Sequence, residues 1–96
     1  MTRIVITGMG AITPLGRDVE STWAAMIRGC SGVRPITLFD PDGFETHIAA
    51  EVKDYQATDF FTAKDARRMD RTTQFAVIAA LEAVKDAGLQ ITDANA

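Results

Sequence analysis

The longest apolar run of the chain, Phe75–Leu81, constrains the fold more than any other feature, because a helix formed by it is apolar on every side. The flanking residues predict this helix over 72–87. Asp70 can cap its start, Lys85 suits the dipole of its last turn, and Gly88 can end it. Such a helix is expected to be buried on all sides, and 96 residues with two predicted strands offer little cover, so we expect it to lie inside a larger protein. Its small residues would let neighbouring elements approach closely: Ala76, Ala79, Ala80 and Ala83.

The start of the chain predicts a strand followed by a glycine turn, which is typical of α/β proteins. Ile4–Thr7 is short, β-branched and apolar on both faces, which predicts a buried strand, and Gly8 and Gly10 follow at once. The two glycines invite a dinucleotide-binding interpretation. However, Thr13 occupies the third small position of that fingerprint, and Pro14 delays the helix that should follow. We therefore favour a structural turn in which backbones pass closely.

A helix is predicted over 19–28, where Asp18 or Ser21 can cap the start and Gly29 can end it. Its apolar stripe consists of Trp23, Ala24, Met26 and Ile27. Residues 29–46 then lack periodicity, and loops of this length are usually functional or packed on another surface. Residues 47–52 alternate, which predicts a half-buried strand with Ile48, Ala50 and Val52 on one face and His47 exposed.

A basic cluster follows in the second half of the chain. Thr62–Asp65 resembles a capping box and predicts a short helix through Arg68 or Met69. If one helix continues, four cations share a stripe at i, i+3, i+4 and i+7: Lys64, Arg67, Arg68 and Arg71. With Asp65 and Asp70 between them the segment carries +2, so the chain of formal charge −3 carries −5 elsewhere. This patch could bind an acidic protein or a phosphorylated group; alternatively it is a solvated helix face, with Arg71 paired inward.

No catalytic, cofactor or metal site is predicted within these residues. Cys30 follows a helix end, where the dipole disfavours a thiolate, so a catalytic pair with His47 is a poor hypothesis. Asp40–Gly43 resembles the start of a calcium loop, but Phe44 and Glu45 stand where an oxygen donor and glycine are required. A β-turn explains the same residues.

The composition sets wider limits. A hydrophobic share of 47% is that of a globular chain, and the net charge of −3 argues against general nucleic-acid binding. A single cysteine excludes an internal disulfide framework. The longest apolar run is far shorter than the about 20 residues of a membrane span, and the start lacks the apolar region of a signal peptide. We therefore expect a cytoplasmic protein with no membrane segment.

Several segments, in order along the chain, resemble the β-ketoacyl-acyl carrier protein synthases, especially the type II elongating enzymes. The matching segments are Arg3–Gly16, Glu20–Trp23, Gly29–Val33, Phe39–Asp40, Lys64–Asp70 and Asp86–Leu89. The resemblance covers essentially the whole chain. It implies an α/β protein with a thiolase-type α/β/α/β/α fold made of two similar halves. Residues 1–96 would be the N-terminal part of the first half.

The resemblance also implies an acyltransferase of fatty acid biosynthesis, a condensing enzyme that performs a decarboxylative Claisen condensation. The cysteine nucleophile and two histidines of that family match no residue here, so these residues alone are predicted to be inactive. The implied partner is acyl carrier protein bearing acyl or malonyl groups, and the full-length enzyme is expected to be a homodimer without a cofactor. A non-catalytic subunit of a polyketide synthase, like the chain-length factors, is the alternative.

The resemblance assigns a role to the basic cluster. In the elongating synthases a Lys-x-x-Arg-Arg stretch contacts the acidic carrier protein, and here it corresponds to Lys64, Arg67 and Arg68. These three residues are therefore the predicted carrier-protein site. Arg71 lies at a variable position of the family pattern and is not assigned to that site.

Overall fold

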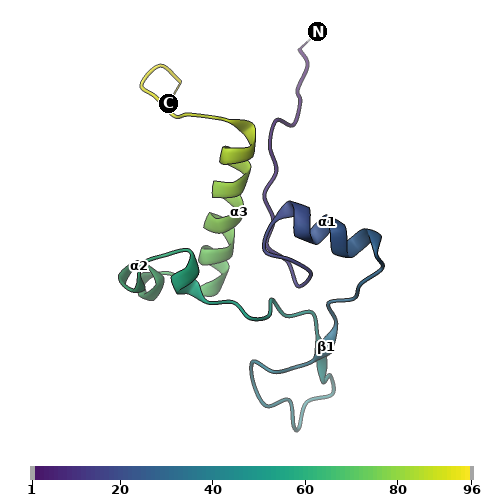
Figure 1. Ribbon diagram of the computed structural model, residues 1–96. Helices are drawn as coiled ribbons and strands as arrows, with labels where there is room; N and C mark the ends of the chain where they lie inside the picture. Colours follow the sequence, from purple (N-terminus) through teal and green to yellow (C-terminus); the bar gives the residue numbers. More distant parts are fainter. Residues whose placement is uncertain (1, 96) are drawn as a thin grey trace. The chain divides into compact units, whose positions relative to one another are not determined.

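The computed structural model describes residues 2–95, which form two compact units. One unit joins Met1–Ala11 to Gln56–Ala96, and the other is Ile12–Tyr55. In chain order the elements are α1 (Val19–Ile27), β1 (Arg34–Pro35), β2 (Ile48–Ala49), the 3-10 helix η1 (Ala57–Asp59), α2 (Ala63–Arg68) and α3 (Arg71–Ala87) (Figure 1). No helix within residues 2–95 has the length and apolarity needed to cross a bilayer.

The first helix, α1, begins and ends where its sequence predicts. Asp18 is the cap: its carboxylate accepts the Ser21 N–H at 2.8 Å, and the Ser21 hydroxyl receives the Asp18 N–H in return. At the other end Gly29 adopts a left-handed φ of 73°, which places the Cys30 N–H 3.0 Å from the Ala25 carbonyl. Both ends thus satisfy backbone groups that a helix leaves unpaired.

The predicted apolar stripe of α1 is not its buried face. Trp23, Met26 and Ile27 are 60%, 54% and 67% exposed, and the buried residue is Ala25. Periodicity identified the helix but not its covered side, because the described residues provide too little packing surface for the large side chains.

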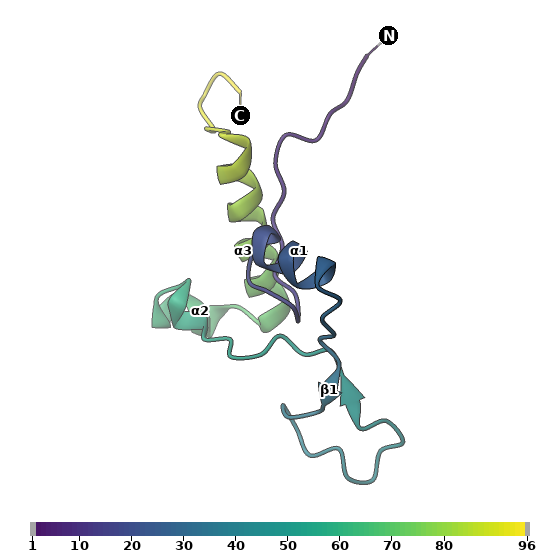
Figure 2. The same ribbon diagram turned by 45° about the vertical axis from the view of Figure 1, so that its right-hand side comes forward.

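Residues 29–46, predicted as a loop, contain a strand. β1 pairs antiparallel with β2, with Arg34 opposite Ala49 and Pro35 opposite Ile48 (Figure 2). A two-residue strand that includes a proline has no periodicity to detect, which is why the sequence missed it. The strand predicted over 47–52 is correspondingly shorter than expected, since only Ile48–Ala49 pairs.

The predicted inward face of that strand is also wrong. Ile48 is 58% exposed and Ala50 is exposed, whereas Glu51 is buried at 9% exposure. The Glu51 carboxylate accepts three hydrogen bonds, from the Thr37 N–H (3.1 Å), the Thr37 hydroxyl (2.9 Å) and the Leu38 N–H (3.1 Å). Burial raises the pKa of Glu51, but these hydrogen bonds and the nearby charge of Lys53 outweigh it, so the pKa lies below its usual value.

The helices α2 and α3 also begin at their predicted caps. Thr62 accepts the Asp65 N–H at 3.1 Å, and Asp70 accepts the Thr73 N–H at 2.7 Å. Gly88 ends α3 with a left-handed φ of 68°. Between the two helices Met69 is extended (φ −121°, ψ 138°), so the basic cluster does not lie on one continuous helix as its spacing had allowed.

The N-terminal segment, residues 2–11, lies along α3 in an extended conformation (Figures 1 and 2). A Cβ on Gly8 or Gly10 would overlap the backbone of α3, at the Ala83 carbonyl and the Ala79 carbonyl respectively. Backbone packs directly on helix at these positions, so the predicted close approach is confirmed. The predicted turn at these two glycines is wrong, because the segment is extended there and the chain turns later, between Thr13 and Gly16. The glycines therefore serve packing against α3.

The predicted strand at Ile4–Thr7 does not form. These residues pair with no strand, and Ile4 and Ile6 are 94% and 83% exposed. A strand exists only through a partner that completes its hydrogen bonds, and within residues 2–95 the only strands are β1 and β2, which pair with each other. Its β-branched composition could indicate a strand without supplying that partner.

The expected burial of α3 on all sides is not achieved by the described residues. Gln74 and Ile78 are its buried residues, whereas Leu81 is 62% and Val84 is 40% exposed. The N-terminal segment covers only the alanine-lined side. An apolar surface of α3 therefore stays uncovered.

Candidate functional site

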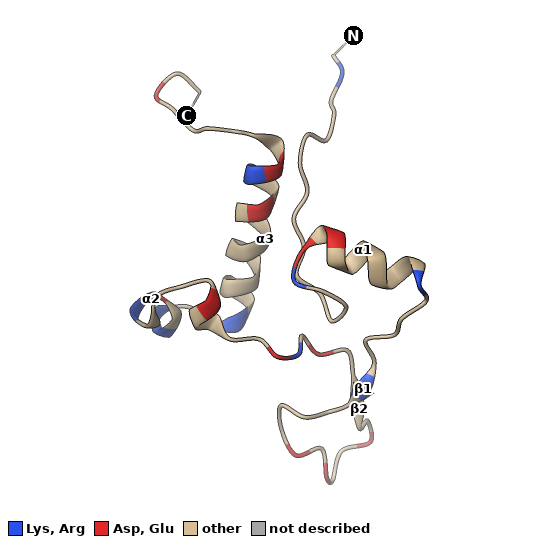
Figure 3. Cartoon of the chain, in the orientation of Figure 1, with Lys and Arg blue, Asp and Glu red and all other residues tan. Residues whose placement is uncertain are grey.

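The α2 basic patch, defined as Lys64, Arg67 and Arg68, brings three cations together on one six-residue helix (Figure 3). All three residues are exposed, and their i, i+3, i+4 spacing places them on one face of α2. Within residues 2–95 none of the three side chains is engaged in an ion pair or a hydrogen bond. The patch is therefore open to an external anionic surface.

Two sets of contacts hold α2 in place beneath the patch. The Thr62 hydroxyl caps its start, accepting the Asp65 N–H at 3.1 Å. At its end the amide of Gln74, on α3, donates to the carbonyls of Ala66 and Met69, both at 3.1 Å. Arg67 and Arg68 lie in the last turn, where cations complement the helix dipole. Local sequence thus sets the ends of α2, and a residue of α3 anchors it.

Arg71 does not extend the patch. The break at Met69 puts Arg71 at the first position of α3, and it is only half exposed. Its guanidinium carbon lies 5.1 Å from the centroid of the Phe75 ring, a cation–π contact. The helical spacing that grouped Arg71 with the other three cations holds only for an unbroken helix, so that grouping is wrong.

Cys30 and His47 are the two residues that the sequence analysis considered as a catalytic pair. In the structure each makes a contact with its own neighbouring backbone. Cys30 is an exposed free thiol whose N–H helps to close the end of α1. His47 is exposed, as its alternation predicts, and its Nε2 lies 2.7 Å from the Phe44 carbonyl oxygen. The described part of the chain holds no group of three or more His, Cys, Asp or Glu side chains placed to bind a metal ion.

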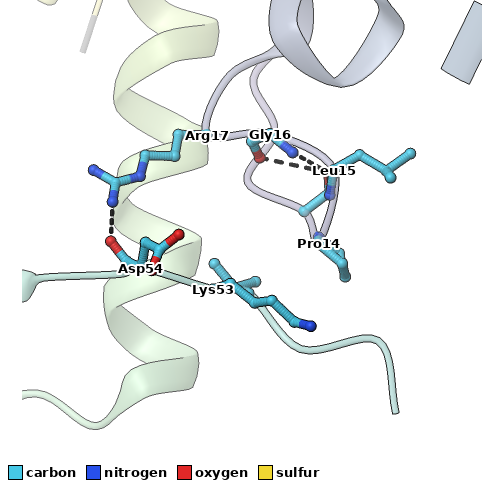
Figure 4. Close-up of a pocket in the computed structure, with 8 residues that line it drawn as sticks. Pro14, Leu15, Gly16, Arg17, Lys53 and Asp54 are labelled. Atoms are coloured by element: carbon cyan, nitrogen blue, oxygen red, sulfur yellow. Dashed lines mark hydrogen bonds between the residues drawn. The ribbon is translucent and has the colours of Figure 1, made fainter. Parts of the chain in front are cut away.

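A hollow of about 350 Å³ lies between Thr13–Arg17 and Val52–Asp54 (Figure 4). The Arg17 guanidinium donates to the Asp54 carbonyl, and Asp54 has a left-handed φ of 55°. Thr13 closes the turn opposite, because its hydroxyl accepts the Leu15 N–H at 3.1 Å and the Gly16 N–H at 3.2 Å. The polar groups at this hollow mostly satisfy one another, so it is less suited to a ligand than the α2 basic patch is.

Comparison with known proteins identifies the family. The sequence profile described as "Beta-ketoacyl synthase, N-terminal domain" matches residues 1–96. The chain belongs to the β-ketoacyl synthase family. This family member is 49% identical over 94 residues to "3-oxoacyl-[acyl-carrier-protein] synthase 2" of Staphylococcus aureus (strain N315), and 45% identical over 94 residues to the protein of the same name from Vibrio harveyi. In both cases the alignment covers 98% of this chain and 23% of the relative, so the chain spans about a quarter of their length.

Two solved structures define the fold of this β-ketoacyl synthase chain. The ishigamide ketosynthase/chain length factor is 43% identical with a TM-score of 0.78, covering 90% of this chain and 21% of its own. A β-ketoacyl synthase from Burkholderia phymatum STM815 is 34% identical with a TM-score of 0.73, covering 97% and 23%. The prediction of an α/β chain forming the N-terminal part of a thiolase-type fold is thereby confirmed, as is the family resemblance.

Proposed function

We propose that this chain is the N-terminal part of a 3-oxoacyl-acyl carrier protein synthase of fatty acid synthesis. The observation that carries the proposal is the family match over residues 1–96, together with the activity that names the two relatives, 3-oxoacyl-acyl carrier protein synthase. On this proposal residues 1–96 are the N-terminal part of the first thiolase-like half, and the full-length enzyme is a cytoplasmic homodimer.

The proposed reaction lengthens an acyl chain by two carbons. A cysteine outside these residues attacks the acyl thioester, and the thiol of the carrier protein leaves. Malonyl-acyl carrier protein then loses carbon dioxide, and the electron pair of the broken bond attacks the enzyme-bound acyl carbon. One carbon–carbon bond forms, the cysteine thiolate is released, and the product is a 3-oxoacyl thioester on the carrier protein. The atoms and electrons of these steps balance without an oxidant or a cofactor.

The contribution of this chain to that reaction is recognition of the carrier protein by the α2 basic patch. Its three cations are exposed and carry no ion pair within the described chain, so binding an acidic surface breaks no existing pair. Opposite charges on two surfaces accelerate encounter and fix the register of docking. An acidic carrier protein fits the patch better than a neutral substrate does.

The test is charge reversal in the full-length enzyme. Changing Arg67→Glu and Arg68→Glu together should raise the KM for malonyl-acyl carrier protein about tenfold at low salt, with kcat little changed. Salt should weaken binding of the unmodified enzyme more than that of the variant, because screening acts on the charges that were removed. Lys85→Glu, which reverses an exposed cation at the far end of α3, is the matched control and should leave KM unchanged. Equal kinetics for all three proteins across salt would exclude the patch as the docking surface.

The alternative is a non-catalytic subunit like the chain-length factors. The observation behind it is the 43% identity to a chain of the ishigamide ketosynthase/chain length factor, whose name covers both kinds of subunit. The residue at the nucleophile position of the full-length protein separates the two: a cysteine supports the condensing enzyme, and any other residue supports the non-catalytic subunit. Condensing activity of the purified full-length protein gives the same distinction independently.

A further inference from the structure

Gln74 is a buried polar residue on α3, at the start of the apolar stretch of that helix. It is 7% exposed, and its side-chain Nε2 donates to the carbonyls of Ala66 and Met69, each at 3.1 Å. These two carbonyls lie at the end of α2, where a helix leaves its last carbonyl groups without partners of its own. A single amide group on α3 therefore donates to both carbonyls, one of which, that of Ala66, also accepts the Met69 N–H, and this amide connects the two helices.

The connection matters because α2 is short and poorly held by its own hydrogen bonds. It has six residues, well below the length at which a helix is stable by itself. Its closing hydrogen bond, from the Met69 N–H to the Ala66 carbonyl, is long at 3.4 Å. The extended backbone of Met69 then separates α2 from α3. The two helices do not form one continuous helix, so the helical backbone does not fix the orientation of α2 relative to α3. The side chain of Gln74 supplies the link that the backbone does not.

We propose that Gln74 is a positioning residue for the α2 basic patch. By tying the end of α2 to α3, it fixes the direction in which Lys64, Arg67 and Arg68 face. The inference rests on the proposed function, since the patch is taken to be the carrier-protein site. Gln74 itself is buried and touches no carrier protein; it acts through the helix that bears the cations.

The chemistry of the side chain explains why glutamine suits this position. Its amide offers two N–H donors, enough for two carbonyl acceptors. A carboxylate of the same length would offer none when ionised, and methionine would fill a similar volume with no donor. Either replacement leaves the Met69 carbonyl to find water or to stay unpaired, and it leaves the Ala66 carbonyl with only the long bond from the Met69 N–H. Both losses favour release of α2.

The experiment compares Gln74→Met and Gln74→Glu in the full-length enzyme with Ile78→Ala as a matched control. Ile78 is also buried on α3, one turn along, so its truncation lowers stability without removing the tie to α2. Both Gln74 variants should exchange the backbone amide hydrogens of α2 about tenfold faster than the unmodified enzyme, while those of α3 change less. They should also raise the KM for malonyl-acyl carrier protein about threefold to tenfold, while kcat and the kinetics with malonyl-pantetheine, which lacks the carrier protein, stay unchanged.

The outcomes separate this inference from the proposed function. Unchanged exchange in α2, or an equal rise in KM for Ile78→Ala, overturns the positioning role. A second outcome also overturns the positioning role: the Gln74 variants exchange the α2 amides faster but keep an unchanged KM, while reversal of Arg67 and Arg68 raises KM. In that case the α2 basic patch binds the carrier protein without needing Gln74. If reversal of those arginines has no effect, the docking surface itself fails and the inference fails with it.

Discussion

Glu82, on α3, accepts a hydrogen bond of 2.9 Å from the backbone N–H of Ala11, which lies 71 residues earlier in the chain. One helical turn away, the Asp86 carboxylate accepts the Met9 N–H at 3.1 Å. The spacings match: two extended residues advance about 7 Å, and four helical residues advance about 6 Å. The N-terminal segment therefore runs antiparallel to α3, with alternate N–H groups meeting carboxylates on successive turns.

The glycines of this segment should be intolerant of any side chain. A methyl group at Gly10 would overlap the Ala79 carbonyl of α3, so we expect Gly10→Ala to destabilise the protein by about 3 kcal/mol or more. Thermal unfolding of the full-length protein measures this. Gly43→Ala is the control: its added methyl meets open space, and its left-handed φ of 86° should cost only about 1 kcal/mol. A smaller loss at Gly10 than at Gly43 would contradict the close packing.

Replacement of Glu82 should separate its acceptor role from its charge. Glu82→Gln keeps a carbonyl oxygen that can accept the Ala11 N–H, so its effect should be small. Glu82→Leu removes the acceptor, and we expect a loss of about 1–2 kcal/mol and faster exchange of the Ala11 amide hydrogen. Equal exchange rates at Ala11 in both variants would show that the hydrogen bond does not hold the segment.

The loop after β1 should loosen at acidic pH because of Glu51. Its pKa is lowered in the folded chain, since the hydrogen bonds from Thr37 and Leu38 outweigh the effect of burial. A lowered pKa means that the stabilisation is complete above the unfolded value of about 4.3 and is lost as pH falls through the folded value below it. Hydrogen exchange at Thr37 and Leu38, corrected for the intrinsic pH dependence, should therefore show less protection at low pH.

Glu51→Gln is the control for this pH effect. The amide cannot ionise, so the difference in protection between pH 6 and pH 3 should shrink at Thr37 and Leu38 in the variant. Asp18 is a useful comparison, because its lowered pKa arises from the cap of α1 and should respond to pH independently of the loop. A variant with the full pH dependence of the unmodified protein would assign the effect to another group.

The 96-residue chain by itself should have no condensing activity. On the proposed function the catalytic cysteine and histidines lie outside these residues, and Cys30 and His47 have structural settings instead. Incubation with acyl- and malonyl-acyl carrier protein should give no 3-oxoacyl product, whereas the full-length enzyme should. Product formed by the short chain would require a nucleophile within it, and Cys30→Ala would then identify or exclude the only thiol.

The sequence alone determined the helices and the family. Side chains that cap or end a helix act on backbone groups within a few residues, so Asp18, Thr62 and Asp70 predicted the starts of α1, α2 and α3 correctly. The three exposed cations of the α2 basic patch also followed from helical spacing, because their neighbours lie within one short helix. Local chemistry sufficed for each of these features.

Only the tertiary structure decided what depends on distant partners. Ile4–Thr7 has the composition of a strand, but no strand within residues 2–95 lies beside it to pair with it. Glu51 is buried, although alternation placed it on the exposed face, because its carboxylate accepts hydrogen bonds from the Thr37 and Leu38 N–H groups. Gln74 reveals its contact with α2 only when both helices are in place. Burial and pairing are relations between segments, and a residue's own type and spacing cannot specify which segment will meet it.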